Sequence, residues 1–287
     1  MPEIGVIGGS GVYEMSALEN VGEVELETPF GAPSDAYVLG ELDGREVAFL
    51  ARHGRDHAMD PSHLPYRANI HGFKQLGVRK IISASAVGSL REGIDPLHMV
   101  IPDQFFDRTR GRISSYFGDG LVAHVSFADP LCGHLGDELA TAAGTEGVTF
   151  HRGGTYVCME GPQFSTRAES HTYRKTVEGA TVIGMTNLQE AKLAREAEIC
   201  YATLALVTDY DCWHETEEAV HTQGVLEILA QNADAARTVI RRCIAALDLS
   251  DRCGCEDALA NAILTPASSI RAEARQRLEL LVGHYLS

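Results

Sequence analysis

The chain opens with an apolar stretch that ends in a glycine-rich turn, IGVIGGSG at residues 4–11. A continuous apolar run is typical of a β-strand covered on both faces, as in α/β proteins. The glycines after it let backbone amides approach an anion closely, and Ser10 adds a hydroxyl donor. The stretch therefore predicts an α/β fold with a candidate anion site, although a tight structural turn explains the glycines equally well.

Two nucleotide-binding motifs are excluded at this turn. A dinucleotide fingerprint starting at Gly9 and Gly11 needs a third glycine at position 14, which is Glu14. No G-K-[ST] triplet follows, as a Walker loop requires. A nicotinamide-dependent dehydrogenase is therefore disfavoured.

Outward from this turn, short β-rich runs alternate with helical patterns along the whole chain. We expect strands over residues 3–7, 24–27, 36–39, 46–51, 80–84, 99–101, 155–159, 181–184 and 202–208. We expect helices over residues 67–76, 130–143, 167–177, 189–197, 225–247 and 270–285, the third begun by a capping box of Thr166 and Glu169 and the last capped by Ser268 and Ser269. No linker or repeat divides the chain. The alternation predicts a single domain over residues 1–287, an α/β sandwich with a mixed central sheet and a C-terminal helical segment at about 256–287.

Composition limits the classes of partner. The 24 Lys and Arg residues against 40 Asp and Glu residues give a formal net charge of −16. An acidic surface argues against nucleic acid, whereas a small anion can still bind where local groups are basic. The apolar runs are too short to span a membrane, and the N-terminus lacks a secretion signal. Seven scattered cysteines then indicate cytosolic thiols, so we expect a cytoplasmic protein.

Two further turns follow predicted strands. ARHGRDH at residues 51–57 offers Arg52 as a two-pronged donor for phosphate and His53 as a second donor, although a solvated loop explains this segment alone better. SAVGS at residues 85–89 follows the strand at 80–84. Ligands of open α/β sheets bind at the carboxyl ends of the strands, so three such turns together favour an anion site.

A family resemblance becomes specific in the second half of the chain. MEGPQFSTRAES at residues 159–170 resembles the E-G-P-x-F-S-x-R-A-E-S motif of the methylthioadenosine phosphorylases, within the trimeric purine nucleoside phosphorylase family. IGMT at 183–186 with Glu190 and LARE at 193–196 matches a second signature, and TDYDCW at 208–213 a third. GGSG at 8–11, ARHG at 51–54 and AVGSLRE at 86–92 match three more in family order. The resemblance spans residues 3 to 245.

The resemblance implies a three-layer, nucleoside phosphorylase-like sandwich and a role for each matched residue. Phosphate would be surrounded by Ser10, Arg52, His53, Ser85, Ala86 and Thr186. Base and ribose would meet Phe164, Ser165, Met185, Asp209 and Asp211, and the 5′ group would meet Val220, Val225, Leu226 and His57, with His124 reaching over from a neighbouring subunit. The three aliphatic residues among these are equally well explained as helix core. The resemblance also implies a homotrimer, no cofactor, and inorganic phosphate as co-substrate in methionine and purine salvage.

The implied reaction is phosphate-dependent cleavage of 5′-methylthioadenosine to adenine and 5-methylthioribose 1-phosphate, and these residue types suit it. Bound phosphate positions the nucleophile and stabilises the cationic sugar. Asp209 is the candidate general acid at purine N7, provided that burial or the neighbouring Asp211 raises its pKa.

Base choice follows from the same carboxyl group. A protonated aspartate can donate to N7 and accept from the 6-amino group of adenine, whereas relatives that cleave 6-oxopurines have asparagine at the matching position. Three alternatives stay open: a phosphorylase of 6-oxopurine nucleosides or methylthioinosine, 5′-deoxyadenosine as a second substrate, and a nucleoside-binding regulator without activity.

The sequence predicts no metal site. The twelve histidines show no metal-ligand spacing, and no C-x-x-C occurs. CGC at residues 253–255 is interpreted as two free thiols in a loop, because a disulfide within C-x-C would be strained and easily reduced. C-x-C pairs occur in thermophilic relatives, so a redox or stabilising role for Cys253 and Cys255 is a hypothesis.

Overall fold

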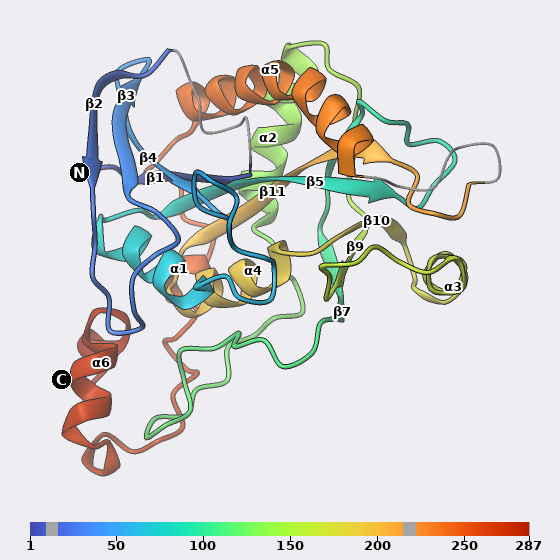
Figure 1. The fold of residues 1–287 in the computed structure, drawn as a ribbon. Coiled ribbons are helices and arrows are strands. Elements are labelled where there is room, and N and C mark those ends of the chain that lie inside the picture. Colours follow the sequence, from blue (N-terminus) through green and yellow to red (C-terminus); the bar gives the residue numbers. More distant parts are fainter. Residues whose placement is uncertain (10–16, 215–221, 287) are drawn as a thin grey trace.

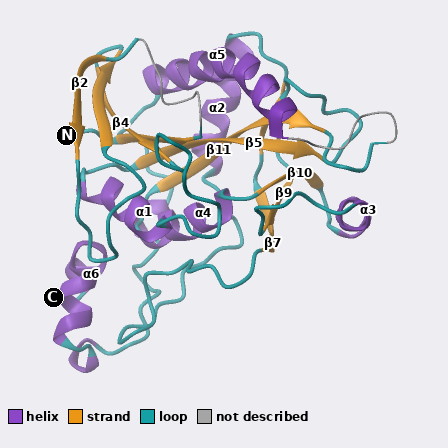
Figure 2. Ribbon diagram, in the orientation of Figure 1, coloured by secondary structure: helices purple, strands orange, loops and turns teal. Residues whose placement is uncertain are grey.

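A large mixed β-sheet runs through the centre of the molecule (Figures 1 and 2). The structure is a computed structural model that describes residues 1–9, 17–214 and 222–286, without the side chains of 222–225. The described part contains the strands β1 (Ile4–Gly8), β2 (Glu19–Val24), β3 (Tyr37–Leu42), β4 (Arg45–Ala51), β5 (Lys80–Ser89), β6 (Met99–Ile101), β7 (Gln104–Arg108), β8 (Phe150–Arg152), β9 (Thr155–Met159), β10 (Ala180–Gly184) and β11 (Cys200–Asp209).

The sheet combines a parallel centre with antiparallel edges. Its main path has the order β2-β3-β4-β1-β5-β10-β9-β7, and β11 pairs with both β5 and β6. β4, β1, β5 and β11 run parallel to one another, so their carboxyl ends lie at one edge. β10 is antiparallel to β5, with Ile183 opposite Gly88.

Helices cover both faces of the sheet, which confirms the predicted sandwich with a mixed sheet. α2 (Gly133–Thr145) and α5 (Thr222–Ala246) lie on one face, and α1 (Tyr66–Gln75) and α4 (Asn187–Glu196) lie on the other (Figure 1). α3 (Arg167–Thr176) lies beyond the β9 and β10 end. The C-terminal segment contains η1 (Cys255–Asp257), η2 (Ala267–Ser269), α6 (Ala272–Val282) and η3 (Gly283–Tyr285). Of these, α6 lies at a corner of the molecule (Figure 1).

Alternate residues of the central strands supply two separate cores. In β4, Val47 and Phe49 pack with the α2 and α5 face, whereas Ala48 and Leu50 pack with the α1 and α4 face. All four side chains are buried, because a strand covered on both faces exposes neither set. This is the physical reason for the continuous apolar runs in the sequence.

Most predicted strands agree with the structure within a few residues, and 99–101 and 155–159 agree in full. The prediction of a strand over 24–27 was wrong: β2 ends at Val24 and comes from the polar residues before it. β7 and β8 were missed because they are short, half exposed and carry polar side chains, so they show no apolar run.

The two capping predictions had different outcomes. At α3, Thr166 accepts from the Glu169 backbone and Glu169 accepts from the Thr166 backbone, which confirms the capping box. The predicted cap of the terminal helix was wrong: Ser268 and Ser269 lie in η2, and α6 starts after Arg271 without a side-chain cap. Within the described residues, no helix has the length and apolar character needed to cross a membrane.

Candidate active site

A cavity of about 490 Å³ lies at the carboxyl ends of the parallel strands. It is bordered by Gly9 after β1 and by Arg52 and His53 after β4. The last residues of strands β5, β10 and β11 complete this border. It unites eleven of the residues that the sequence singled out: Arg52, His53, His57, Ser85, Ala86, Phe164, Met185, Thr186, Asp209, Asp211 and Leu226. Several of these residues meet here because a parallel sheet collects the carboxyl ends of its strands at one edge, whereas Leu226 is contributed by α5.

Arg52 forms the charged floor of the cavity, with its side chain 2% exposed. Its Nε donates to Glu190 Oε1 at 2.5 Å, and its Nη2 donates to Ser83 Oγ at 2.7 Å and to Glu190 Oε2 at 3.2 Å. Burial opposes its charge, but the Glu190 carboxylate raises the pKa of Arg52 above its ordinary value. Glu190 therefore takes up the bidentate hydrogen bonding, through Nε and Nη2 of Arg52, that was expected to bind phosphate. Among the described residues Nη1 donates to the carbonyl of Ala84, which leaves its second hydrogen for a bound anion.

A buried asparagine organises the hydroxyl groups of this floor. Asn187 Oδ1 accepts from Ser85 Oγ at 2.8 Å and from Thr186 Oγ1 at 3.4 Å. The remaining partners of Asn187 are Tyr156, Ser83, Tyr201 and Thr203. The predicted donors Ser85 and Thr186 thus hold their hydrogens toward Asn187, and an incoming phosphate must compete for them.

His53 lies beside Arg52 as a neutral ring. Burial and the Arg52 charge lower the pKa of His53 to about 4. Its Nδ1 lies 2.8 Å from the carbonyl oxygen of Met59, which can only accept, so Nδ1 carries the hydrogen. The ring of His57 stacks on it with centroids 4.3 Å apart. At neutral pH the Nε2 of His53 is therefore an acceptor, which suits the P–OH group of hydrogen phosphate rather than the donor role expected from the sequence.

Asp209 and Asp211 stand together at the end of β11. Burial raises the pKa of Asp209, against the hydrogen bonds from Thr208 and from the Asp211 backbone. Asp209 Oδ1 accepts from the Asp211 backbone at 2.7 Å, and Oδ2 accepts from Thr208 Oγ1 at 2.7 Å. Burial raises the pKa of Asp211 too, and the charge of Asp209 raises it further. Asp211 Oδ2 is buried without a hydrogen-bond partner in the described part of the chain.

Gly88 in β5 makes room for this pair. A Cβ atom built there would lie 2.8 Å from Asp209 Oδ1 and 3.1 Å from the Asp211 nitrogen. The register between β5 and β11 shifts at this point, so that Asp209 stands opposite Gly88. The Asp211 backbone has a φ of 52°, a conformation that few non-glycine residues adopt. The close approach of the two strands therefore determines where the carboxyl groups lie.

Part of the cavity wall is apolar. Met159, Ile183, Met185 and Leu229 contribute to it, and Phe164 and Leu226 lie at the rim, 40% and 50% exposed. Exposed apolar side chains at a cavity mouth indicate that a ligand or a second chain covers them. This wall suits an apolar substituent.

Arg112 holds the loop that carries the E-G-P motif, although no sequence signal marked it. Its side chain is 2% exposed and donates to the backbone carbonyls of Glu160 and Met185. It also donates to Gln189 Oε1 at 3.1 Å and pairs with the Glu160 carboxylate. A lone arginine in a polar loop resembles any surface arginine, so only the fold reveals this contact. Glu190, quoted within a motif, was likewise given no role.

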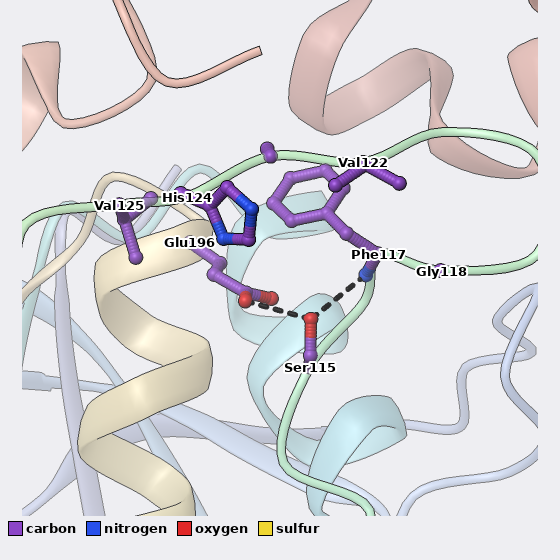
Figure 3. Close-up of a pocket in the computed structure, with 8 residues that line it drawn as sticks. Ser115, Phe117, Gly118, Val122, His124, Val125 and Glu196 are labelled. Atoms are coloured by element: carbon purple, nitrogen blue, oxygen red, sulfur yellow. Dashed lines mark hydrogen bonds between the residues drawn. The ribbon is translucent and has the colours of Figure 1, made fainter. Parts of the chain in front are cut away.

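Some predicted residues are not among those that line the cavity. Ser165 is partly buried behind the wall, with its hydroxyl 3.7 Å from Met159 Sδ. His124 lies in a separate cavity of about 410 Å³ with Ser115, Phe117 and Glu196 (Figure 3). Ser10 and Val220 lie outside the described residues, and the side chain of Val225 does too.

Fold and site together define a phosphorylase-type enzyme, and comparisons with known proteins agree. The phosphorylase superfamily model matches residues 3–245. A relative from Koribacter versatilis, named S-methyl-5′-thioadenosine phosphorylase, is 57% identical over 99% of this chain and 96% of its own length. A relative of the same name from Geobacter sulfurreducens is 55% identical over 99% of both chains.

Solved structures give the same result. A methylthioadenosine phosphorylase from an Antarctic soil metagenomic library superimposes with a TM-score of 0.93, with 54% identity and 98% coverage of both chains. A variant of the Schistosoma mansoni adenosine/methylthioadenosine phosphorylase, in complex with methylthioadenosine, superimposes at 0.84 with 32% identity, covering 94% of this chain and 99% of that one. The chain belongs to the phosphorylase superfamily and, within it, to the S-methyl-5′-thioadenosine phosphorylases.

Proposed function

We infer that the chain cleaves 5′-methylthioadenosine with inorganic phosphate, releasing adenine and 5-methylthioribose 1-phosphate. The observation that carries this is one cavity with three kinds of surface: a cationic floor at Arg52, a buried pair of carboxyl groups at Asp209 and Asp211, and an apolar wall. The identity of 55–57% to two S-methyl-5′-thioadenosine phosphorylases supports the same reaction.

In the reaction, the C1′–N9 bond breaks and a bond forms between C1′ and a phosphate oxygen. The bonding electrons pass to the purine, and a proton must reach N7. Arg52 and the backbone at the ends of β1 and β5 hold phosphate near C1′, where its charge stabilises the cationic sugar. His53, neutral through Nδ1–H to Met59, accepts the P–OH hydrogen and orients the phosphate.

Asp209 is the proposed donor of that proton. When its Oδ2 is protonated, Thr208 Oγ1 can turn to the Val87 carbonyl, 3.2 Å away, so that Oδ2–H is released toward the base. Asp211 Oδ2, which has no hydrogen-bond partner among the described residues, is the proposed acceptor for the 6-amino group of adenine. This divides the two contacts to adenine between the two aspartates.

The 5′ group and the neighbouring subunit complete the proposal. Leu226, with Val220 and Val225 from the same region of the chain, forms the methylthio pocket, and His57 helps to close it. In a homotrimer His124 of the adjoining subunit reaches this pocket. His124 and Val122, which line the second cavity and are exposed, support an interface on that side of the chain.

The test is a phosphate-dependent assay on methylthioadenosine, 5′-deoxyadenosine, adenosine and inosine. We expect adenine release that requires phosphate, fastest with methylthioadenosine. Release without phosphate would show a hydrolase, and inosine as the best substrate would favour the 6-oxopurine alternative. Full binding without turnover would favour the regulatory protein.

Asp209→Asn tests the carboxyl assignment. An amide cannot protonate N7, so kcat/KM for methylthioadenosine should fall by about 10²–10⁴-fold while the preference shifts toward inosine. Asp234→Asn, on the exposed face of α5, is the matched control and should leave both values unchanged. An unchanged preference for adenine in the Asp209 variant would contradict the assignment.

A further inference from the structure

Four of the cysteines that are far apart in the sequence meet in the fold, and we call them the four-cysteine cluster: Cys132, Cys200, Cys253 and Cys255. Every pair of their sulfur atoms lies within 4.8 Å. Cys200 Sγ is 3.1 Å and Cys132 Sγ is 3.5 Å from Cys253 Sγ. Three of the side chains are buried and that of Cys253 is partly buried. The prediction of scattered thiols therefore holds along the chain but not in space.

Three different elements bring the cluster together. Cys132 is the N-cap residue of α2, and Cys200 is the first residue of β11. Cys253 and Cys255 flank Gly254, whose φ of 81° turns the backbone in the left-handed conformation. This turn lets both cysteines of the C-x-C segment face the other two. The cluster thus joins the segment after α5 to the central sheet.

The arrangement has the dimensions of a tetrahedral tetrathiolate. Zinc binds thiolate sulfur at about 2.3 Å, which places the four sulfurs about 3.8 Å from one another. The sulfur separations here, from 3.1 Å to no more than 4.8 Å, lie around that value. Four protein ligands and no open position are the pattern of a structural site. All four residues are free thiols in the structure.

The surroundings favour thiolates at part of the cluster. The backbone N–H of Leu135 donates to Cys132 Sγ at 3.5 Å, and the positive end of the α2 dipole points at the same sulfur. Glu256 opposes this, because its Oε2 lies 3.7 Å from Cys253 Sγ. Arg252 pairs with Glu256 at 2.9 Å and offsets that charge. A divalent cation at the centre would offset two of the four negative charges of the thiolates.

We propose that the four-cysteine cluster binds one Zn²⁺ ion as a structural site that fastens the C-terminal segment to the sheet. On binding, each thiol loses its proton to solvent and each sulfur forms one bond to the metal. Cys200 begins β11 and Asp209 ends it, nine residues and roughly 30 Å away at about 3.3 Å per residue, so the ion takes no part in the proposed reaction.

The test is metal analysis of the full chain purified under reducing conditions with zinc supplied. We expect one zinc per chain that survives gel filtration, and, after exchange for Co²⁺, the absorption bands of tetrahedral cobalt bound by thiolates. Removal of zinc with a chelator should lower the melting temperature, and added zinc should restore it. This readout is independent of catalysis, so it fails separately from the proposed function.

Two variants locate the ion. Cys253→Ser combined with Cys255→Ser should abolish stoichiometric zinc and the cobalt bands, whereas Cys243→Ser should keep both. Cys243 is the matched control because it is fully buried in the same hydrophobic core but lies outside the cluster. Wild-type protein that remains zinc-free with all seven thiols titratable, or that forms two disulfides in place of binding zinc, would overturn the proposal.

Discussion

At the scale of single residues, the floor of the candidate active site is formed by charged side chains that are buried away from solvent. Arg52 and Glu190 have side chains exposed by 2% and 0%. A buried pair adds little net stability over an apolar pair, but the loss of one member leaves the other charge without compensation. The pair therefore serves to hold a positive group rigidly beneath the anion site.

Glu190→Gln should destabilise the protein by about 3–5 kcal/mol, because the Arg52 charge then remains buried with no counter-charge. The free energy of unfolding from urea titration measures this. Glu92→Gln removes an exposed ion pair with Arg174 and serves as the control, with no measurable change expected. Equal stability of the two variants would mean that Arg52 is not confined as described.

Glu196, which lines the separate cavity with His124 (Figure 3), makes the free energy of unfolding depend on pH. Burial raises the pKa of Glu196 to about 7 from its ordinary 4.5, even though it accepts hydrogen bonds from Tyr116 and Ser115. Between pH 4.5 and 7 the folded state then binds more protons than the unfolded state. The contribution of Glu196 to the free energy of unfolding is therefore fully present below pH 4.5 and is lost as the pH rises through 7.

Glu196→Gln should therefore become more stable relative to wild type as the pH rises through this range. The free energy of unfolding of the variant, minus that of wild type, should increase from pH 4.5 to pH 7 and stay constant above. His53 acts in the opposite sense, because its lowered pKa costs stability as pH falls from 6.5 to about 4, but it is present in both proteins and cancels. A difference that does not vary with pH would contradict the assignment.

At the scale of elements, the junction of β5 with β11 decides the geometry of the carboxyl pair. The register shift after Val207 brings Asp209 opposite Gly88, and the missing side chain there lets the strands approach. The same junction places the Ser85 hydroxyl over Asn187 at the start of α4. One strand pair thus positions both the phosphate side and the base side of the cavity.

Gly88→Ala should lower kcat/KM by about 10²-fold or more, because the added Cβ displaces the carboxyl group of Asp209 from its position. Steady-state kinetics with methylthioadenosine and phosphate measure this. Gly93→Ala is the matched control, since no atom of the described part of the chain lies within 4 Å of a Cβ at that position. Similar losses in both variants would indicate a general effect of the added methyl group.

At the scale of the whole molecule, the cavity is the meeting point of elements from both halves of the chain. Its borders come from β1 and β4 in the first half and from β10 and β11 in the second. A ligand that contacts all of them stabilises only the folded state. The net charge of −16 repels phosphate at long range, so binding depends on the local field at Arg52.

Inorganic phosphate should therefore raise the melting temperature in a concentration-dependent manner. At a phosphate concentration 100 times the dissociation constant, the added stability should be about 2.7 kcal/mol. Differential scanning calorimetry measures the shift, with potassium chloride at matched ionic strength as the control. An identical shift in chloride would indicate a general salt effect and would argue against a phosphate site.

The α/β class and most strand positions could be predicted from local patterns in the amino-acid sequence, because apolar runs mark strands buried on both faces and glycine-rich or charged turns mark strand ends. The family resemblance added most of the residues that line the cavity. Since a parallel sheet collects those ends at one edge, motifs at residues 51–57, 85–89 and 208–213 had to lie close together.

The contacts that these residues make are set by the three-dimensional fold. Glu190 reaches Arg52 across 138 positions, Met59 sets the tautomer of His53, and Arg112 clamps a distant loop. The four-cysteine cluster is of the same kind, because ligand spacing read along the chain carries no information about sulfurs brought together by a helix, a strand and a loop. Hydrogen bonds and metal geometry depend on distances in space, which local sequence patterns do not contain.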